Sequence, residues 1–199
     1  MKRGKAPDHY TQRAKREGYP ARSVYKLEEI HLKQPLFRPG DTVLDIGAAP
    51  GSWSLYLSRN LGPEGRVVAV DLKPLGLEAT PENLTILTGD IYDEATQGEI
   101  AAAGPFDAVV SDAAPGTTGN RSVDTSRSAG LVEFFIEMLP AWLRPGGAFV
   151  AKLFQGGEER ALLEECRHRF ASAKMFKPRA CRTDSFETFL VAADYRRQR

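Results

Sequence analysis

Cysteine is almost absent from this sequence. Only Cys166 and Cys181 occur among its 199 residues, and neither stands in a CxxC pair or beside a cluster of histidines. Proteins built on disulfides or structural zinc use more cysteines at closer spacing. We therefore expect a protein of a reducing compartment that holds no metal.

Long apolar runs are missing as well. No stretch approaches the ~20 apolar residues that a membrane-spanning helix needs, and the first residues lack the apolar run of ~7–15 residues that marks a signal peptide. With 42% hydrophobic residues, the chain can still bury the core of one domain of roughly 150–200 residues. These features predict a soluble, cytoplasmic protein.

A strong net charge is lacking because the charges of different segments cancel to +1. Residues 1–38 hold ten lysines and arginines against four acids, and residues 174–199 hold seven against three. Residues 39–173, in contrast, hold ten against nineteen. An acidic body with basic ends favours an anionic partner, although a solvated tail and C-terminus would give the same pattern.

A glycine-rich turn stands at the start of the acidic body. The segment TVLDIGAAPGSW is a short apolar run that closes with Asp45, turns at Gly47 and Gly51 and opens a helical pattern. This order is typical of a nucleotide-type cofactor site. Pro50 removes an amide N–H from the turn, so the segment departs from the Gly-x-Gly-x-x-Gly fingerprint of pyrophosphate sites. NAD is compatible with the fold alone, but the motif favours another ligand.

Strand and helix patterns alternate from Asp41 onward. This alternation predicts a doubly wound, mostly parallel α/β sheet with helices on both faces. We divide the chain into a basic N-terminal arm and helix, 1–38, and a main domain, 39–199. The expected strands cover 42–46, 66–71, 84–88, 106–111, 146–154, 173–177 and 186–193, and the expected helices cover 21–33, 52–61, 94–103, 123–143 and 157–170.

Four successive predicted strands close with an acid, at Asp45, Asp71, Asp90 and Asp112. Ligands of such sheets bind beyond the carboxyl ends of the strands, so these side chains would share one site. A site rich in carboxylates suits a ligand with positive charge and hydroxyls better than one with phosphates. S-adenosylmethionine fits, with Asp71 accepting from ribose hydroxyls and Asp90 from the adenine amino group. Trp53 would form an apolar wall of this site or pack in the core.

Several motifs in order resemble the FtsJ/RrmJ family of ribose 2′-O-methyltransferases, over residues 10–195. They are DIGAAPGSW, SDAAP, AKLFQG, the helix ARSVYKLEEI and the strand-ending acids. The resemblance implies a Rossmann-like, S-adenosylmethionine-dependent methyltransferase fold, whose seven-stranded sheet has its last strand antiparallel. It also implies a catalytic set of Lys26, Asp112, Lys152 and Glu187. Together with the glycine-rich turn, it places the cofactor contacts at Asp45, Gly47, Pro50, Gly51, Trp53, Asp71, Asp90 and Asp112.

The four catalytic positions suit methyl transfer to a sugar hydroxyl. An alcohol is a weak acid, so a carboxylate of pKa ~4 is a poor base for it, whereas a lysine of pKa ~10.4 is better matched once burial and a second cation lower that pKa. We expect Lys152 to be the base and Lys26 the neighbouring cation that meets the nucleotide. Asp112 would orient Lys152, and Glu187 a lysine or the ribose. Taken singly, each residue is also compatible with an ordinary solvated charge.

The resemblance further implies an RNA substrate, with a uridine of large-subunit (23S-type) ribosomal RNA as the first expectation. Arg3, Lys5, Arg22 and Lys26 would contact the RNA, mainly through phosphates. Two alternatives stay open: ribose methylation of transfer RNA, and an S-adenosylmethionine-binding RNA chaperone or ribosome assembly factor without turnover. We expect a monomer with no DNA or membrane partner.

Two segments depart from the family pattern on the side expected to face RNA. Residues 116–119 read GTTG where the family commonly has Asn-Met-Ser-Gly, and Ser185-Phe186 stands where it commonly has Ser-Arg. These departures bear on substrate choice more than on chemistry. Methylation of a base nitrogen would require a doubled proline and an aromatic after Asp112, and cytosine C5 methylation would require a cysteine there. The sequence has neither.

Overall fold

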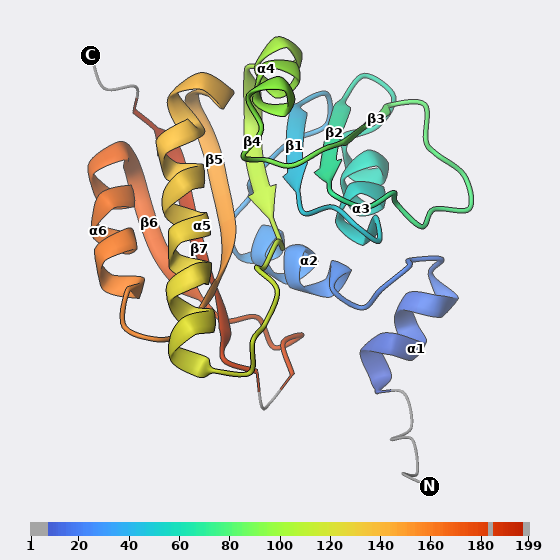
Figure 1. Cartoon of the computed structure of the whole chain (residues 1–199). Helices are drawn as coiled ribbons and strands as arrows, with labels where there is room; N and C mark the ends of the chain where they lie inside the picture. Colours follow the sequence, from blue (N-terminus) through green and yellow to red (C-terminus); the bar gives the residue numbers. More distant parts are fainter. Residues whose placement is uncertain (1–7, 183–184, 197–199) are drawn as a thin grey trace, which may run out of the picture.

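A seven-stranded sheet forms the centre of the molecule (Figure 1). The computed structural model describes residues 8–182 and 185–196. The strand order is β3-β2-β1-β4-β5-β7-β6, in which β7 runs antiparallel to both neighbours while the pairs among β1–β5 are parallel. The strands are β1 (Thr42–Ile46), β2 (Arg66–Asp71), β3 (Leu84–Thr88), β4 (Phe106–Ser111), β5 (Leu143–Phe154), β6 (Phe170–Phe176) and β7 (Glu187–Tyr195). The expected sheet with an antiparallel last strand is confirmed.

Helices cover both faces of this sheet, as the alternating pattern predicts. Figure 1 shows α5 and α6 in front of the strands and α2 behind them. The face behind carries α1 (His9–Arg16), α2 (Val24–Lys33) and α3 (Ser52–Leu61), and the face in front carries α4 (Glu94–Ala103), α5 (Arg121–Trp142) and α6 (Glu159–Arg169).

Each face of the sheet supports its own apolar core. Side chains alternate across a strand, so Val43 packs with the α1–α3 layer while its neighbour Leu44 packs with the α4–α6 layer. Both residues are fully buried. Burial on two faces explains why the central strands read as continuous apolar runs, which is typical of parallel sheets.

The basic N-terminal segment contains a helix, α1, that the sequence analysis did not anticipate. Its first turn is capped by Asp8, whose Oδ1 accepts a hydrogen bond from the Thr11 backbone N–H at 2.9 Å, and its last turn is basic, which suits the helix dipole. Ala14 on α1 and Leu27 on α2 are buried in the same core as β1. The described part of residues 1–38 therefore packs onto the sheet.

The boundaries of the C-terminal elements differ by a few residues from those expected. β5 begins at Leu143 rather than at residue 146, because Leu143 already pairs with Phe106 across an irregularity in the ladder. β6 begins at Phe170, directly after α6, since the buried ring of Phe170 pairs with Tyr195 of β7.

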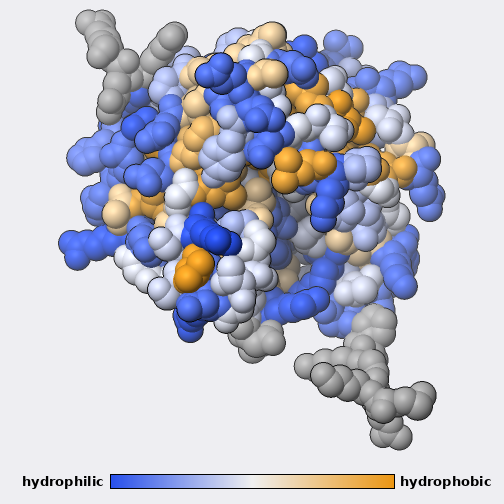
Figure 2. Space-filling view, in the orientation of Figure 1, coloured by the Kyte–Doolittle hydropathy of each residue, from blue (hydrophilic) through white to orange (hydrophobic). Residues whose placement is uncertain are grey.

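Among the described residues, every helix is too short or too polar to cross a bilayer. Figure 2 shows the face of Figure 1 as mostly hydrophilic, with a hollow near its middle.

Candidate active site

The turn after β1 brings two segments of the chain unusually close. Gly47 has φ +73°, and a Cβ there would lie 2.5 Å from the Cβ of Ala113, in the segment after β4. Gly51 has φ +108°, and its Cβ would lie 2.7 Å from Leu77 Cδ2. Both positions require glycine for conformation and for space. The turn is thereby pressed against the residue that follows Asp112.

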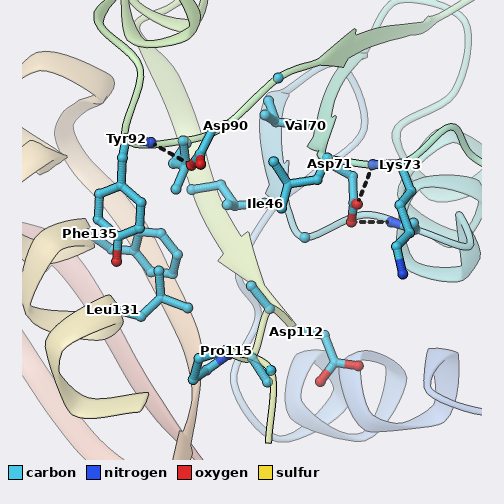
Figure 3. Close-up of a pocket in the computed structure, with 18 of the residues that line it drawn as sticks. Ile46, Val70, Asp71, Lys73, Asp90, Tyr92, Asp112, Pro115, Leu131 and Phe135 are labelled. Atoms are coloured by element: carbon cyan, nitrogen blue, oxygen red, sulfur yellow. Dashed lines mark hydrogen bonds between the residues drawn. The ribbon is translucent and has the colours of Figure 1, made fainter. Parts of the chain in front are cut away.

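A cavity of about 830 Å³ opens beside this turn, at the carboxyl ends of β1, β2, β3 and β4 (Figure 3). Three of the expected acids line it: Asp71, Asp90 and Asp112. Gly47 lines it as well. The other lining residues are Ile46, Ala49, Val70, Leu72, Lys73, Gly89, Ile91, Tyr92, Ala113, Ala114, Pro115, Gly116, Arg127, Gly130, Leu131 and Phe135.

Backbone hydrogen bonds hold two of these carboxylates in place. Asp71 accepts from the N–H of Ala49 at 2.9 Å and from the N–H of Lys73 at 2.8 Å. Asp90 accepts from the N–H of Tyr92 at 3.0 Å. Each carboxylate keeps lone pairs for a ligand, because an ionised carboxylate offers about four acceptor sites.

The cavity suits S-adenosylmethionine in volume and in the chemistry of its lining. Asp71 and Asp112 lie across the cavity from the apolar side chains Leu131 and Phe135 of α5, and Asp90 lies beside Tyr92 (Figure 3). These carboxylates are acceptors for hydroxyl, amino and cationic groups. The ring of Tyr92 lies 4.6 Å from that of Phe134 and extends the apolar wall. A volume of this size is typical of small-molecule sites.

Three of the expected cofactor residues shape the turn or the core behind it. Trp53 is 2% exposed, donates from Nε1 to the Ser23 carbonyl at 2.9 Å and lies 6.0 Å from the ring of Phe189. Trp53 thus packs α2 on the sheet, and its expected contact with the cofactor stays a prediction. Pro50 and Gly51 contact the 72–81 segment, where Gly76 N–H donates to the Pro50 carbonyl at 3.0 Å.

Asp45 lies beneath the turn, fully buried. Its Oδ2 accepts from the Ser54 hydroxyl at 2.6 Å, while its Oδ1 has no hydrogen-bond partner among the described residues. Burial raises the pKa of Asp45 to about 7. This carboxyl therefore couples β1 to α3 from inside the core.

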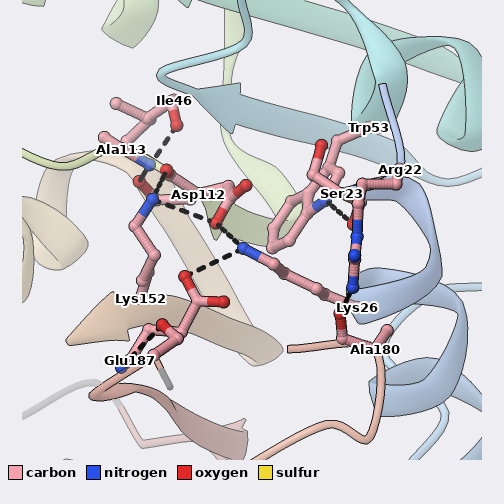
Figure 4. Close-up of polar contacts among 12 residues, drawn as sticks. Arg22, Ser23, Lys26, Ile46, Trp53, Asp112, Ala113, Lys152, Ala180 and Glu187 are labelled. Carbon is pink, nitrogen blue, oxygen red and sulfur yellow. Dashed lines mark hydrogen bonds and ion pairs between the residues drawn. The ribbon is translucent and has the colours of Figure 1, made fainter. Parts of the chain in front are cut away.

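Below the cavity, the structure brings together all four residues of the expected catalytic set (Figure 4). Lys26 Nζ lies 3.0 Å from Glu187 Oε2 and 3.5 Å from Asp112 Oδ1. Lys152 Nζ lies 3.2 Å from the same Asp112 oxygen and donates to the Asp112 backbone carbonyl. The four side chains are only 12–17% exposed. Both amines thus converge on one carboxylate.

Each member of this quartet comes from a different element. Lys26 projects from α2, Asp112 follows β4, Lys152 stands on β5 and Glu187 begins β7. Lys152 pairs with Phe189 in the β5–β7 ladder, and Glu187 lies two residues away from Phe189 on the same face of the sheet. Asp112 also lines the cavity, so it is the link between the cofactor site and the lysines.

The charges of the quartet are mutually compensated. Burial alone would lower the pKa of Lys26, but the carboxylates of Asp112 and Glu187 outweigh it and raise that pKa. Burial would likewise raise the pKa of Glu187, yet the Lys26 charge and hydrogen bond, with help from Cys181 and Lys152, lower it. Lys26 is therefore a cation and Glu187 an anion at neutral pH.

The four residues expected to contact RNA do not lie together in one described surface. Arg3 and Lys5 lie outside the described residues. Arg22 forms an ion pair with Asp8 and donates to the Ala180 carbonyl at 2.6 Å, so it ties the start of α1 and the 177–182 segment to α2. Lys26 belongs to the quartet.

Several cavity residues were not predicted from the sequence. Tyr92 follows the strand-ending Asp90 by two residues, and an aromatic residue so close to a strand end could have been predicted to line the site. Arg127 and Leu131 reach the cavity from one face of α5, far in sequence from any strand end, and nothing in the pattern marks them. Among the described residues, no three His, Cys, Asp or Glu side chains cluster as metal ligands would.

The FtsJ-like methyltransferase family model matches residues 19–195 of the chain. The chain is 51% identical over 190 residues to ribosomal RNA large subunit methyltransferase E of Treponema denticola, covering 96% of each chain. It is 47% identical over 191 residues to the protein of the same name from Nitratidesulfovibrio vulgaris, covering 95% of this chain and 94% of that one.

Solved structures share the fold. A ribosomal RNA methyltransferase from Plasmodium falciparum superposes with a TM-score of 0.76 at 24% identity, over 89% of this chain and 98% of that one. Aeropyrum pernix fibrillarin, solved with bound S-adenosyl-L-methionine, gives a TM-score of 0.60 at 18% identity, over 86% and 76%. The sheet, the matched length and the identity to curated relatives agree: the chain belongs to the FtsJ-like methyltransferase family.

Proposed function

We propose that this methyltransferase moves the methyl group of S-adenosylmethionine to the 2′-hydroxyl of a ribose, in a uridine of large-subunit ribosomal RNA. The observation that carries the proposal is the sharing of Asp112. This residue lines the cavity and also contacts both lysines, at 3.5 and 3.2 Å. A methyl donor and a hydroxyl acceptor would therefore meet at one carboxylate.

The donor would be held by the acids at the strand ends, Asp71, Asp90 and Asp112, against the apolar side of the cavity. When bound, S-adenosylmethionine supplies a methyl group already activated by a sulfonium centre, so the protein has to position and deprotonate the acceptor. Alignment of reacting groups can contribute roughly 7–11 kcal/mol, against about 3–5.5 kcal/mol for general-base help of ~10²–10⁴-fold. Positioning is accordingly the larger task of the quartet.

The partners of the two lysines support different roles for them in this proposal. Lys26 faces two carboxylates, which keep it charged, and it suits the binding of the nucleotide. Lys152 faces one carboxylate and a backbone carbonyl. A backbone carbonyl bears no net charge, so Lys152 has one charged partner where Lys26 has two. In this proposal Lys152 is the base, oriented by Asp112, while Glu187 orients Lys26.

The proposed substrate follows from the names of the curated relatives, which are ribosomal RNA large subunit methyltransferases at 51% and 47% identity. The basic arm agrees with an RNA partner. In this proposal residues 1–38 contact the RNA through Arg3, Lys5, Arg22 and Lys26, and residues 39–199 form the methyltransferase domain. The enzyme acts as a cytoplasmic monomer, without DNA or membrane partners.

The test is transfer of labelled methyl from S-adenosylmethionine to three acceptors: large ribosomal subunits, protein-free ribosomal RNA and transfer RNA. Mass spectrometry of the digested product then maps the modified nucleotide. We expect a single 2′-O-methyluridine in the large-subunit RNA. Label confined to transfer RNA, label on a base, or no transfer despite cofactor binding would overturn the proposal in favour of one of the alternatives.

A further inference from the structure

Two aromatic rings lie side by side just beyond the quartet. The centroids of Phe154 and Phe186 are 4.7 Å apart, with their planes inclined at 53°. The guanidinium of Arg121, at the start of α5, lies 5.3 Å from the centroid of Phe186. Phe186 is thus flanked by an aromatic ring and by a cation. None of these three residues has a role in the proposed chemistry.

The strand ladder fixes these rings relative to the catalytic residues. Phe154 pairs directly with Glu187 across β5 and β7, and it follows Lys152 by two positions. Side chains two apart on a strand, and those directly paired across strands, lie on the same face. Phe154 therefore shares the face of Lys152 and Glu187. Phe186 precedes Glu187, and its carbonyl accepts from the Gln155 N–H at 2.8 Å.

The two rings are not part of the hydrophobic core. Among the described residues, both apolar clusters of the sheet are assembled without Phe154 or Phe186. Both rings are half-buried and Arg121 is exposed, with its Nη2 3.5 Å from the Gln155 carbonyl. A pair of aromatic side chains that packs on itself at a strand end leaves ring surface for a ligand.

An unpaired RNA base is the ligand that this surface suits. Proteins hold splayed-out bases by stacking them on aromatic rings and on arginine guanidinium planes. Both kinds of surface are present here, and the positive charge of Arg121 complements the phosphates beside such a base. An apolar protein partner would instead leave that charge buried without a partner.

We propose that Phe154, Phe186 and Arg121 form a stacking platform for an unpaired base of the RNA substrate. The inference rests on the proposed function, because it takes the ribose beside Lys152 as the reaction site. The platform is a binding and positioning device. It adds contacts to RNA at the carboxyl end of β5, where Ser185-Phe186 leads into β7.

The test compares Phe186→Leu and Phe186→Tyr in the full chain. Leucine keeps an apolar side chain but loses the ring face, whereas tyrosine keeps the ring. We expect Phe186→Leu to raise the KM for large ribosomal subunits about tenfold, within the range of base–aromatic stacking. Phe186→Tyr should stay within about twofold of the wild type. Arg121→Ala should raise the same KM, while Arg167→Ala on α6, an exposed arginine paired with Glu164, serves as its matched control.

Two further measurements separate this inference from its alternatives. The Kd for S-adenosylmethionine and the thermal midpoint should be unchanged in Phe186→Leu, because the ring lies outside both the cavity and the core. A wild-type KM in Phe186→Leu, or a failure of tyrosine to restore it, overturns the platform. The binding affinity for a fluorescein-labelled single-stranded oligouridylate measures base binding by the platform without any methyl transfer. If the wild type methylates no ribose, the proposed function fails. The oligouridylate binding measurement would still show whether the platform binds RNA bases.

Discussion

Asp112 connects the two parts of the site through its carboxylate. It lies within 3.5 Å of two lysine amines and borders the cavity for the methyl donor. Charged groups in a partly buried site are stable only when they compensate one another. The second carboxylate, Glu187, provides that compensation for Lys26. The two cations and two anions of the quartet therefore compensate one another, and removal of one charge should destabilise the charged forms of its partners.

We predict that Glu187→Gln lowers both the pKa of Lys26 and the stability of the fold, the latter by about 1–3 kcal/mol at pH 7. The Lys26 amine would lose its nearest anion, at 3.0 Å. Because the folded state lowers the pKa of Glu187, its stabilisation is present above the ordinary value of 4.5 and is lost as the pH falls through the folded value. Urea unfolding from pH 3 to 7 and NMR titration of Lys26 measure both effects.

The matched control for this variant is Glu164→Gln. Glu164 pairs with Arg167 on the surface of α6, where both side chains are about half exposed, and such pairs contribute about 0–1 kcal/mol. A stability loss in Glu187→Gln no larger than in this control would mean that the quartet is not electrostatically coupled.

Asp45 gives a pH dependence of the opposite sign. Burial raises its folded pKa from 3.8 to about 7, so the folded state binds its proton more tightly than the unfolded chain does. The free energy of unfolding should therefore fall as the pH rises from about 4 to about 7, by at most about 4 kcal/mol from this group. We predict that Asp45→Asn removes this part of the slope. Unfolding curves of both proteins across this pH range measure it; equal slopes would contradict the prediction.

For individual residues, the sequence predicted which side chains lie together in the site but not the contact partners of each one. Lys26 and Lys152 are 126 positions apart, and only the family resemblance linked them. The acids at the strand ends were read from the pattern, yet Asp45 lies inside the core while Asp71 and Asp90 face the cavity. That difference depends on where each strand stops relative to its neighbours, which a single strand does not reveal.

At the scale of the elements, the turn between β1 and α3 governs how the cavity is built. Gly47 sits against Ala113, and Asp112 precedes that contact. A displacement of the turn would therefore also displace the segment after β4. Gly40 has a similar positive φ, +89°, but open space around it. Alanine substitutions at Gly47 and Gly40 therefore separate the cost of backbone strain, which both share, from the cost of the contact with Ala113, which only Gly47 has.

We predict that Gly47→Ala destabilises the fold by about 2–4 kcal/mol, since a Cβ at 2.5 Å from Ala113 adds overpacking to the strain of a positive φ. It should also weaken S-adenosylmethionine binding by displacing the segment after Asp112. Gly40→Ala, with strain alone, should cost about 1 kcal/mol and leave cofactor affinity unchanged. Calorimetric unfolding and isothermal titration of the cofactor measure both. Equal effects of the two variants would show that the Ala113 contact is unimportant.

The elements themselves were predictable where one physical signal dominated. β1–β4, α3 and α4 have the expected bounds. The signal is strongest in β2 and β4, whose buried apolar runs are typical of parallel strands. α1 was missed because it is short and basic, and its buried face reduces to Ala14. Its position depends on tertiary contacts, such as the Arg13 guanidinium 4.2 Å from the centroid of the Tyr25 ring, that local pattern does not encode.

At the scale of the whole molecule, charge is distributed to suit a large anionic substrate. The basic termini flank an acidic body, and α2 connects the basic segment directly to the quartet through Lys26. The fold class and the antiparallel last strand followed from the alternation and the family resemblance. The large-subunit ribosomal RNA substrate followed from the resemblance and not from the charge pattern, because phosphate contacts carry no sequence information.

We predict that RNA affinity falls steeply with salt and that the double variant Arg3→Ala, Lys5→Ala flattens this dependence. Each phosphate contact contributes about −0.7 to the slope of log K against log salt for single strands, so the double variant should reduce its magnitude by about 1–2. Filter binding of labelled ribosomal RNA from 50 to 300 mM salt measures the slopes. Arg167→Ala controls for loss of charge alone, and a flat response in the wild type would refute the role of the basic arm.

In the proposed mechanism, Lys152 removes the proton of a sugar hydroxyl placed beside Asp112. Its most direct test is the single-turnover rate of 2′-O-methylation of large ribosomal subunits by the wild type and by Lys152→Ala, with the Kd for S-adenosylmethionine measured on both. We predict a rate loss of at least ~10²–10⁴-fold with cofactor affinity within about twofold. A variant that methylates at the wild-type rate, or that loses activity only because it no longer binds the cofactor, would contradict the account.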